Sequence, residues 1–191
     1  PEITVVVSPL IALMKDQVDN LVASGVQATF LNSSLTPSES SSRKNELIEG
    51  KYQILYVAPE RLVMPDFMFL MNKMKVGLVA IDEAHCISAW GHDFRPEYRQ
   101  LNTLREAFPH IPILALTATA TGRVREDIAT QLSLKSARAF SSTFNRPNLF
   151  YSVSRKMDVK KQILNFLEQR PGESGIVYCF SRDAAEKLTD Y

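Results

Sequence analysis

The sequence predicts an α/β fold in which helices cover both faces of a parallel sheet. Short β-branched and apolar runs alternate with segments of helical periodicity along most of the 191 residues. The apolar runs lack the polar alternation of a half-exposed sheet, so their strands are expected to be buried on both faces. Two acids, Asp82 and Glu83, directly follow one such run. That places them at the carboxyl edge of the sheet, where open α/β folds bind ligands.

The individual elements follow from the same periodicities. The expected strands are apolar, β-branched runs at residues 3–7, 26–31, 52–57, 76–81, 111–116 and 174–180. The expected helices carry apolar residues three and four apart, at 9–24, 36–50, 66–74, 97–108, 122–132, 158–170 and from 182 onward. Gly25 is the expected end of the first helix. Thr36 and Gly50 are the expected N-cap and stop of the second.

Composition is ordinary for a soluble protein with a real core, at 45% hydrophobic and 23% charged residues. The formal net charge is only +1, so nucleic-acid binding would have to rest on a local surface. Cys86 and Cys179 indicate thiols of an intracellular protein more than a disulfide framework. Neither a signal peptide nor an apolar run of the roughly 18 residues that span a membrane is present, so no membrane partner is expected.

The regular alternation pauses at residues 140–154 and then begins again. We therefore expect a boundary near Ser152, with a first domain over 1–151 and the beginning of a second over 152–191. The chain starts within a strand, without an initiator methionine, and stops within a helical pattern. It is expected to be a fragment of a longer protein.

The acidic pair admits two interpretations on its own. An aspartate that ends a strand after four or five apolar residues is the Walker-B arrangement, whose carboxylate holds Mg²⁺ on nucleotide phosphates. The next residue, Glu83, would then orient or deprotonate the attacking water. Acids at the end of a strand also cap the following helix, and the bare pair leaves this alternative open.

The surrounding sequence resembles a known family. DEAH at 82–85 resembles motif II of superfamily 2 helicases, and the longer AIDEAHCISAWGHDFRPEY resembles the RecQ family of DNA helicases. Further segments resemble that family's motifs in the same order: VVVSPLIALMKDQV (5–18), LYVAPERL (55–62), ALTATAT (115–121), SSTFNRPNLFY (141–151) and IVYCFSR (176–182). The resemblance covers nearly the whole chain.

This resemblance implies a RecA-like first domain that lacks its N-terminal P-loop part, followed by the start of a second RecA-like domain. It implies an ATP-dependent 3′-to-5′ DNA helicase active in DNA repair and recombination, with ATP and Mg²⁺ as cofactors. Single-stranded DNA and duplex junctions are the implied partners, in the bacterial cytoplasm or the eukaryotic nucleus.

The resemblance also assigns roles at the ATP site. Asp82 is expected to hold Mg²⁺ through water, and Glu83 to activate the attacking water, so both belong to the nucleotide site. His85 is the third catalytic candidate, placed to link that site to Thr117 or Thr119, the expected coupling residues. Without the resemblance, His85 would be interpreted as an ordinary loop histidine, and one of the threonines as a helix cap.

Trp90, Phe94 and Arg95 in the loop after the acids are expected to bind DNA. Aromatic faces stack on unpaired bases whatever the sequence, and arginines meet phosphates. The loop would thus report the presence of single-stranded DNA to the ATP site. The alternative is that Trp90 and Phe94 simply pack the loop down.

Ser8, Pro9 and Lys15 form a second group of DNA-binding candidates. They lie at the end of the first strand and in the helix after it. A hydroxyl, the amides of a helix N-terminus and a lysine suit backbone phosphates. For Lys15 alone, an exposed helix lysine is an equally good interpretation.

Other readings of the sequence are weaker. The seven glycines form no G-x-x-x-x-G-K-[S/T] string, and in RecQ relatives this P-loop lies just upstream, so the fragment alone is expected to be inactive. A non-catalytic nucleic-acid-binding module therefore stays an alternative. An RNA helicase would lack the ISAWGHDFRPEY loop, and no G-x-G-x-x-G supports an oxidoreductase. A zinc site from His85, Cys86, His92 and Asp93 is rejected because the spacing fits no common zinc pattern.

Overall fold

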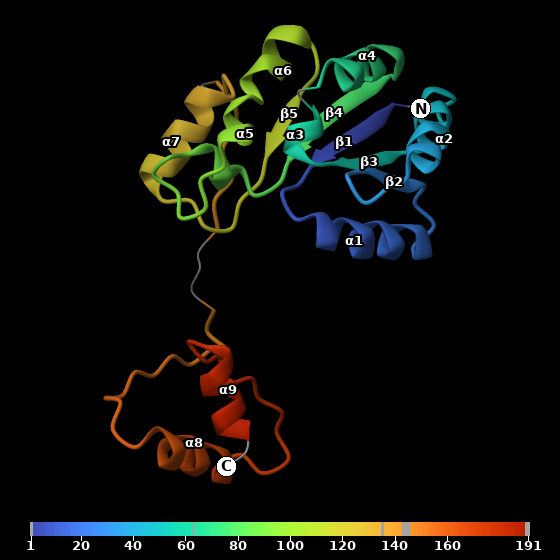
Figure 1. The fold of residues 1–191 in the computed structure, drawn as a ribbon. Helices are drawn as coiled ribbons and strands as arrows, with labels where there is room; N and C mark the ends of the chain where they lie inside the picture. The colour runs from blue at the N-terminus through green and yellow to red at the C-terminus, as the bar shows by residue number, and fades with distance from the viewer. Residues whose placement is uncertain (1, 63, 135, 143–145, 190–191) are drawn as a thin grey trace. The chain divides into compact units, whose positions relative to one another are not determined.

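The computed structural model describes residues 2–62, 64–134, 136–142 and 146–189 (Figure 1). Part of the predicted motif over 141–151 therefore lies outside the described residues. The chain divides into two compact units, Pro1–Ala139 and Phe140–Tyr191. The division falls earlier than the predicted boundary near Ser152, and each unit is described by itself.

The first unit is built on a five-stranded parallel sheet with strand order β2-β3-β1-β4-β5. The strands are β1 (Ile3–Val7), β2 (Ala28–Leu31), β3 (Ile54–Val57), β4 (Val76–Ile81) and β5 (Ile113–Ala115). Each falls within a predicted run. The parallel α/β sheet that the sequence predicts is confirmed.

The strand register aligns the carboxyl ends of the central strands. Val7 of β1 pairs with Val57 of β3 on one side and with Ile81 of β4 on the other. Ser8 and Asp82, the residues that follow β1 and β4, consequently emerge side by side at one edge of the sheet. This is the edge at which the sequence places the site.

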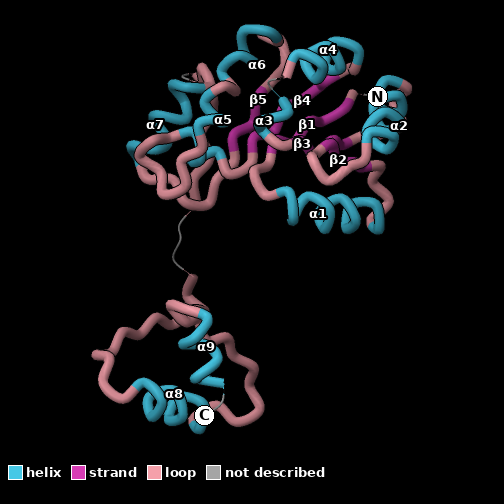
Figure 2. Tube along the Cα trace, viewed as in Figure 1, coloured by secondary structure: helices cyan, strands magenta, loops and turns pink. Residues whose placement is uncertain are grey.

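Helices flank the sheet in the first unit (Figure 2). They are α1 (Ile11–Ala23), α2 (Pro37–Ile48), α3 (Pro59–Leu62), α4 (Pro65–Lys73), the 3₁₀ turn η1 (Ala84–Ile87), α5 (Pro96–Arg99), α6 (Asn102–Ala107) and α7 (Gly122–Gln131). The predicted helix over 97–108 is divided into α5 and α6. The Leu101 N–H bonds to the Tyr98 carbonyl at 3.2 Å, an i→i−3 contact that tightens the chain where both side chains are fully buried.

Burial on both faces of the sheet follows from the alternation of side chains along each strand. Leu31 of β2 packs in the larger core cluster, which includes Phe67 of α4. Its neighbour Phe30 packs on the opposite side with Met14 and Val18 of α1. Figure 1 shows α1 and α4 on opposite faces. Among the described residues, no helix combines the length and the hydropathy needed to cross a membrane.

The second unit contains α8 (Val159–Glu168) and α9 (Arg182–Thr189). No described side chain in this unit is buried. The strand predicted over 174–180 is absent, which corrects that expectation: residues 173–179 have no regular structure. A strand needs a neighbour for its backbone hydrogen bonds, and no other described segment of this unit is extended in a sheet.

Candidate functional site

Asp82 is held at the sheet edge through its backbone. Its N–H donates to the Val7 carbonyl at 2.9 Å, which continues the pairing of β1 and β4 by one residue. Its own carbonyl accepts from the hydroxyl of Tyr98 on α5 at 3.0 Å. Tyr98 is fully buried, and this burial raises the pKa of its hydroxyl, so the group stays a protonated donor. The Asp82 carboxylate itself is half-buried.

Glu83 adopts a left-handed backbone conformation, with φ 47° and ψ 43°. This region is sparsely populated by residues with a side chain, and such strained positions concentrate at functional sites. The Glu83 N–H donates to Asp82 Oδ1 at 2.9 Å, which orients the neighbouring carboxylate. The turn at Glu83 also starts η1 and so directs His85 back toward the sheet.

His85 is buried and its Nδ1 faces several oxygen atoms. Thr117 Oγ1 lies 3.0 Å from it, Thr119 Oγ1 3.3 Å and Glu83 Oε2 3.1 Å. A backbone bond from the Ala84 N–H to the Leu116 carbonyl, 2.9 Å long, brings the two segments together. The predicted contact between His85 and the two threonines is therefore present. Its coupling role stays a prediction.

The loop after η1 folds back tightly on His85. The His92 ring stacks on the His85 ring, with centroids 4.5 Å apart and planes inclined by 17°. A Cβ added to Gly91 would lie 2.7 Å from the His85 carbonyl oxygen, closer than real Cβ contacts. Only glycine fits there without a backbone shift. Sequence reasoning missed this role, although a glycine between Trp90 and His92 was a visible signal for close backbone approach.

Arg95 joins this loop to the end of β1. Its Nη1 donates to the Pro9 carbonyl at 3.3 Å, while Nε and Nη2 donate to Asp93 Oδ2 at 3.3 and 3.1 Å. The guanidinium lowers the pKa of the Asp93 carboxyl. Two predicted DNA-binding residues, Pro9 and Arg95, are thus brought together although they are far apart in the sequence.

The two aromatic candidates of the loop are accessible to a ligand. Trp90 is 61% exposed and Phe94 38% exposed. Each carries an arginine on its ring: the Cζ atom of Arg123 lies 3.3 Å from the Trp90 centroid, and that of Arg99 lies 5.1 Å from the Phe94 centroid. Trp90 is mostly exposed and Phe94 mostly covered, so the DNA-binding role of the two rings stays a prediction.

In the second group of DNA-binding candidates, Ser8 and Lys15 are not positioned as a shared phosphate site. Ser8 is 2% exposed, so its hydroxyl does not face solvent. Lys15 lies on α1 and pairs with Asp19 one turn further along the helix, which raises the lysine pKa. This arrangement favours the simpler interpretation of Lys15 as an exposed helix lysine.

A pocket of about 200 Å³ connects these parts of the site. Its lining comes from the end of β1, from η1 and the loop after it, and from the segment after β5: Pro9, Leu10, Glu83, His85, His92, Asp93, Ala118 and Thr119. Its lining is partly polar and includes the carboxylates of Glu83 and Asp93. It lies beside the candidate catalytic residues of the first unit.

The structure brings His85, Cys86 and Asp93 together, with ligand atoms within 4.8 Å of one another. Cys86 Sγ lies 3.8 Å from both His85 Nε2 and Asp93 Oδ2. Burial raises the pKa of the Cys86 thiol to about 11, with the Asp93 carboxylate as a second cause. The Asp93 carboxylate is already paired with Arg95, with Nη2 3.1 Å from Oδ2. We interpret the cluster as a hydrogen-bonded network, and the spacing of its residues fits no common zinc pattern.

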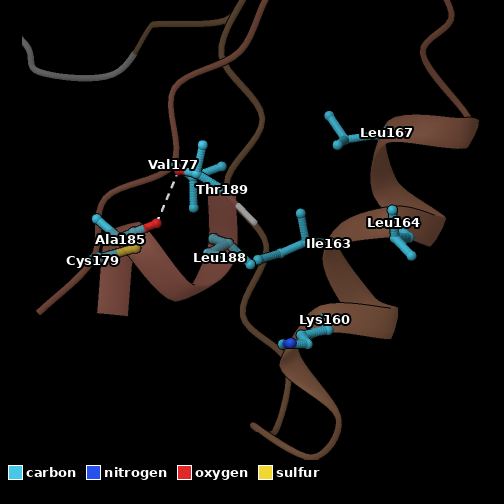
Figure 3. Close-up of a pocket in the computed structure, with 9 residues that line it drawn as sticks. All are labelled: Lys160, Ile163, Leu164, Leu167, Val177, Cys179, Ala185, Leu188 and Thr189. Atoms are coloured by element: carbon cyan, nitrogen blue, oxygen red, sulfur yellow. Dashed lines mark hydrogen bonds between the residues drawn. The ribbon is translucent and has the colours of Figure 1, made fainter. Parts of the chain in front are cut away.

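A second pocket, of about 330 Å³, lies within the second unit (Figure 3). Apolar side chains of α8 and α9 line it together with Val177 and Cys179. Figure 3 shows Val177 and Cys179 facing these helices, which leaves Ile176 and Tyr178 exposed at 80% and 90%. The segment keeps the alternation of a strand although it is unpaired, and the pocket holds none of the candidate catalytic residues.

Comparison with protein families supports the sequence motifs. A family model described as "DEAD/DEAH box helicase" matches residues 1–128. The chain is 48% identical over 188 residues to the ATP-dependent DNA helicase RecQ of Pasteurella multocida, covering 98% of the chain and 30% of that protein. It is 38% identical over 205 residues to the RecQ-like DNA helicase BLM of Xenopus laevis, covering 100% of the chain and 15% of that protein. The chain thus spans less than a third of either relative.

Solved structures resemble the chain in fold. The DUF1998 helicase MrfA matches 99% of the chain with a TM-score of 0.65 at 17% identity, over 30% of its own length. The helicase Lhr of Mycobacterium smegmatis matches 99% of the chain with a TM-score of 0.57 at 22% identity, over 27% of its length. These likenesses support the RecA-like α/β fold. The family match over 1–128 shows that the chain belongs to the DEAD/DEAH box helicase family, and the chain is similar to RecQ-type DNA helicases.

Proposed function

We propose that this chain carries the water-activating and DNA-sensing part of an ATP-dependent DNA helicase of RecQ type. The complete protein would move 3′ to 5′ on single-stranded DNA and open duplexes at junctions during DNA repair and recombination. One observation carries the proposal: His85 Nδ1 contacts both Glu83 and Thr117, and the His85 ring stacks on His92 of the aromatic loop. The buried His85 thus contacts the catalytic acid Glu83, the threonine segment and the aromatic loop.

The sheet edge suits Mg²⁺ and ATP. Asp82 offers hard carboxylate oxygens at a strand end, the donors that Mg²⁺ prefers, and its Oδ1 is already oriented by the Glu83 N–H. Asp82 would hold the ion through water, and the ion would neutralise charge on the nucleotide phosphates. Glu83 has the role of orienting or deprotonating the attacking water. The sequence itself contains no G-x-x-x-x-G-K-[S/T] string that would grip the phosphates.

The aromatic loop suits single-stranded DNA. Trp90 and Phe94 offer exposed rings on which successive bases would stack, and Arg95, the residue after Phe94, bonds to the carbonyl of Pro9, which lines the pocket. The relatives' names specify DNA as their nucleic acid, which supports DNA over RNA here. A protein with this activity works where chromosomal DNA is, in the bacterial nucleoid or the eukaryotic nucleus.

Glu83→Gln tests the catalytic assignment in the complete protein that contains this chain. Loss of the general base should lower the turnover number for ATP by about 10²- to 10⁴-fold, while the dissociation constant for ATP stays near its original value. Steady-state hydrolysis and equilibrium nucleotide binding measure the two quantities. Retained turnover in the variant would remove Glu83 from the reaction.

Trp90→Ala and Phe94→Ala test the sensing role of the loop. Each should lower the DNA-stimulated rate of ATP hydrolysis more than the basal rate, because the stacking platform is lost while the acids are intact. Phe69→Ala is the matched control, since Phe69 is 63% exposed on α4, outside the loop. Equal loss of the stimulated and basal rates would contradict a sensor and indicate a damaged ATP site.

A further inference from the structure

Arg123 on α7 covers the ring of Trp90, which the proposed function assigns to DNA binding. Arg123 places its guanidinium carbon 3.3 Å from the centroid of Trp90. This separation corresponds to direct stacking on the ring face. Trp90 nevertheless stays 61% exposed, so much of the side chain is left for a base.

The position of Arg123 is fixed by the start of its helix. Thr121 is the N-cap of α7, and its hydroxyl accepts from the Val124 N–H at 3.4 Å. Val124 itself is buried in the larger core cluster, and α7 packs against η1. The guanidinium therefore approaches Trp90 from an anchored helix end, whereas Trp90 belongs to a surface loop.

The same backbone segment leads back to the ATP site. Thr117 and Thr119, which contact His85, lie only a few residues before Arg123, in the stretch that joins β5 to α7. A shift of Trp90 that moves Arg123 would act on the beginning of α7 and hence on these threonines. Arg123 thus contacts the Trp90 ring and follows Thr117 and Thr119 closely along the chain.

We propose that Arg123 is a positioning residue, which holds Trp90 in the orientation that stacks on an unpaired base and links that ring to the Thr117–Thr119 segment. The proposal rests on the proposed function of the aromatic loop. An aromatic side chain that is ordered in advance loses less conformational freedom when DNA binds. Exposed cation–π contacts of this kind correspond to about a two- to fivefold effect on an equilibrium constant.

The first test needs no DNA. Trp90 is the single tryptophan of the sequence, so the intrinsic tryptophan fluorescence of this chain reports its surroundings alone. Arg123→Ala should shift the emission and increase quenching by acrylamide, because the guanidinium no longer covers the ring. Arg170→Ala is the matched control: it removes a guanidinium 3.9 Å from Phe166 and should change neither signal. Unchanged emission and quenching in Arg123→Ala would overturn the proposal.

The second test separates positioning from simple phosphate binding. Binding of a labelled oligothymidylate to the complete protein is measured by anisotropy for Arg123→Ala, Trp90→Ala and the double variant. Arg123→Ala should weaken binding about two- to fivefold alone and have no further effect when Trp90 is absent. Arg123→Lys, which keeps a cation near the ring, should recover part of the loss. An equal loss with and without Trp90 would make Arg123 a phosphate contact and overturn the positioning role.

Failure of the proposed function would look different. If Trp90→Ala binds oligothymidylate as tightly as the unchanged protein, the loop is not the DNA surface, whatever the fluorescence of Arg123→Ala shows. The fluorescence measurement tests whether Arg123 contacts the Trp90 ring. The binding measurements on the single and double variants test whether that contact affects DNA affinity.

Discussion

His85 presents one ring nitrogen, Nδ1, to oxygen atoms of Glu83, Thr117 and Thr119. That nitrogen carries either one proton or one lone pair. Only a protonated Nδ1 bonds the acceptor carboxylate of Glu83, whereas an unprotonated Nδ1 accepts from a threonine hydroxyl. The contacts at this buried residue therefore have alternative arrangements. His85 Nδ1 can bond either to Glu83 or to a threonine hydroxyl, and its role in coupling the nucleotide site to a DNA site stays a prediction.

The neighbouring Cys86 should be unreactive at neutral pH. It is fully buried, and burial raises the pKa of its thiol from 9.0 to about 11. Alkylating reagents attack the thiolate, so iodoacetamide at pH 8 should modify Cys179 and spare Cys86. Mass spectrometry of tryptic peptides measures the two extents separately. Both cysteines should react once the chain is unfolded in urea, which controls for the reagent.

The same pKa shift predicts how Cys86 affects folding as the pH rises. Because the folded-state pKa is the higher one, its thiol favours the folded state fully below pH 9, and this stabilisation is lost as the pH rises toward 11. In that window, Cys86→Ala should show a smaller fall in melting temperature than the unchanged chain. Equal alkylation of the two cysteines at pH 8 would contradict both the burial and the shifted pKa.

At the scale of elements, α2 is stabilised at its N-terminus by a capping box, in addition to side-chain contacts such as that of Arg43 with Phe30. Only Leu47 of this polar helix is buried. The Thr36 hydroxyl accepts from the Glu39 N–H at 3.3 Å, and the Thr36 N–H donates to Glu39 Oε2 at 2.8 Å. This reciprocal capping box satisfies backbone donors that the helix itself leaves open.

Thr36→Ala should therefore lower the free energy of unfolding by about 1 kcal/mol. Urea denaturation followed by circular dichroism measures the change. Thr36→Ser keeps an accepting hydroxyl and should cost much less, and Ser38→Ala in the first turn of the same helix serves as a control outside the N-cap position. A loss as large for Ser38→Ala as for Thr36→Ala would show that the cap is not the cause.

The elements also show what sequence reasoning reaches. Thr36 was predicted as an N-cap and the β4 run as a strand ending at Asp82, because local chemistry and periodicity determine both. Tyr98 was not identified as the donor to the Asp82 carbonyl, and the predicted helix over 97–108 gave no sign of its division. Both depend on how α5 packs against the sheet edge. The strand expected over 174–180 failed because strand formation needs a pairing partner, which local sequence does not supply.

At the scale of the whole molecule, the site was likewise predictable only where sequence patterns determine it. The resemblance to the RecQ family implied that Asp82, Glu83 and His85 would lie near Thr117 or Thr119, and the carboxyl ends of parallel strands do meet at one edge of a sheet. The contacts of Arg95 with Pro9 and of Arg123 with Trp90 were not predicted. Arg95 is partly buried and reaches a backbone carbonyl, whereas Arg123 and Trp90 are exposed side chains, and no periodic pattern specifies either placement.

The two units should also differ in their resistance to proteolysis. The first unit has two buried apolar clusters, whereas no described side chain between residues 140 and 189 is buried. A segment without buried contacts opens at little cost in free energy, and proteases cleave such open states first. Brief digestion with trypsin should therefore cut after Arg155 or Lys156 well before any site in the first unit.

Mass spectrometry of the time course identifies the cleavage sites, and circular dichroism measures whether the surviving fragment still unfolds cooperatively. The fragment that ends beyond Ala139 should keep the melting temperature of the uncut chain, because the apolar clusters that stabilise the sheet lie wholly before that residue. Digestion in denaturing urea should remove the difference between the units. Cleavage of both units at similar rates without urea would mean that the second unit is stabilised by contacts comparable to those of the sheet.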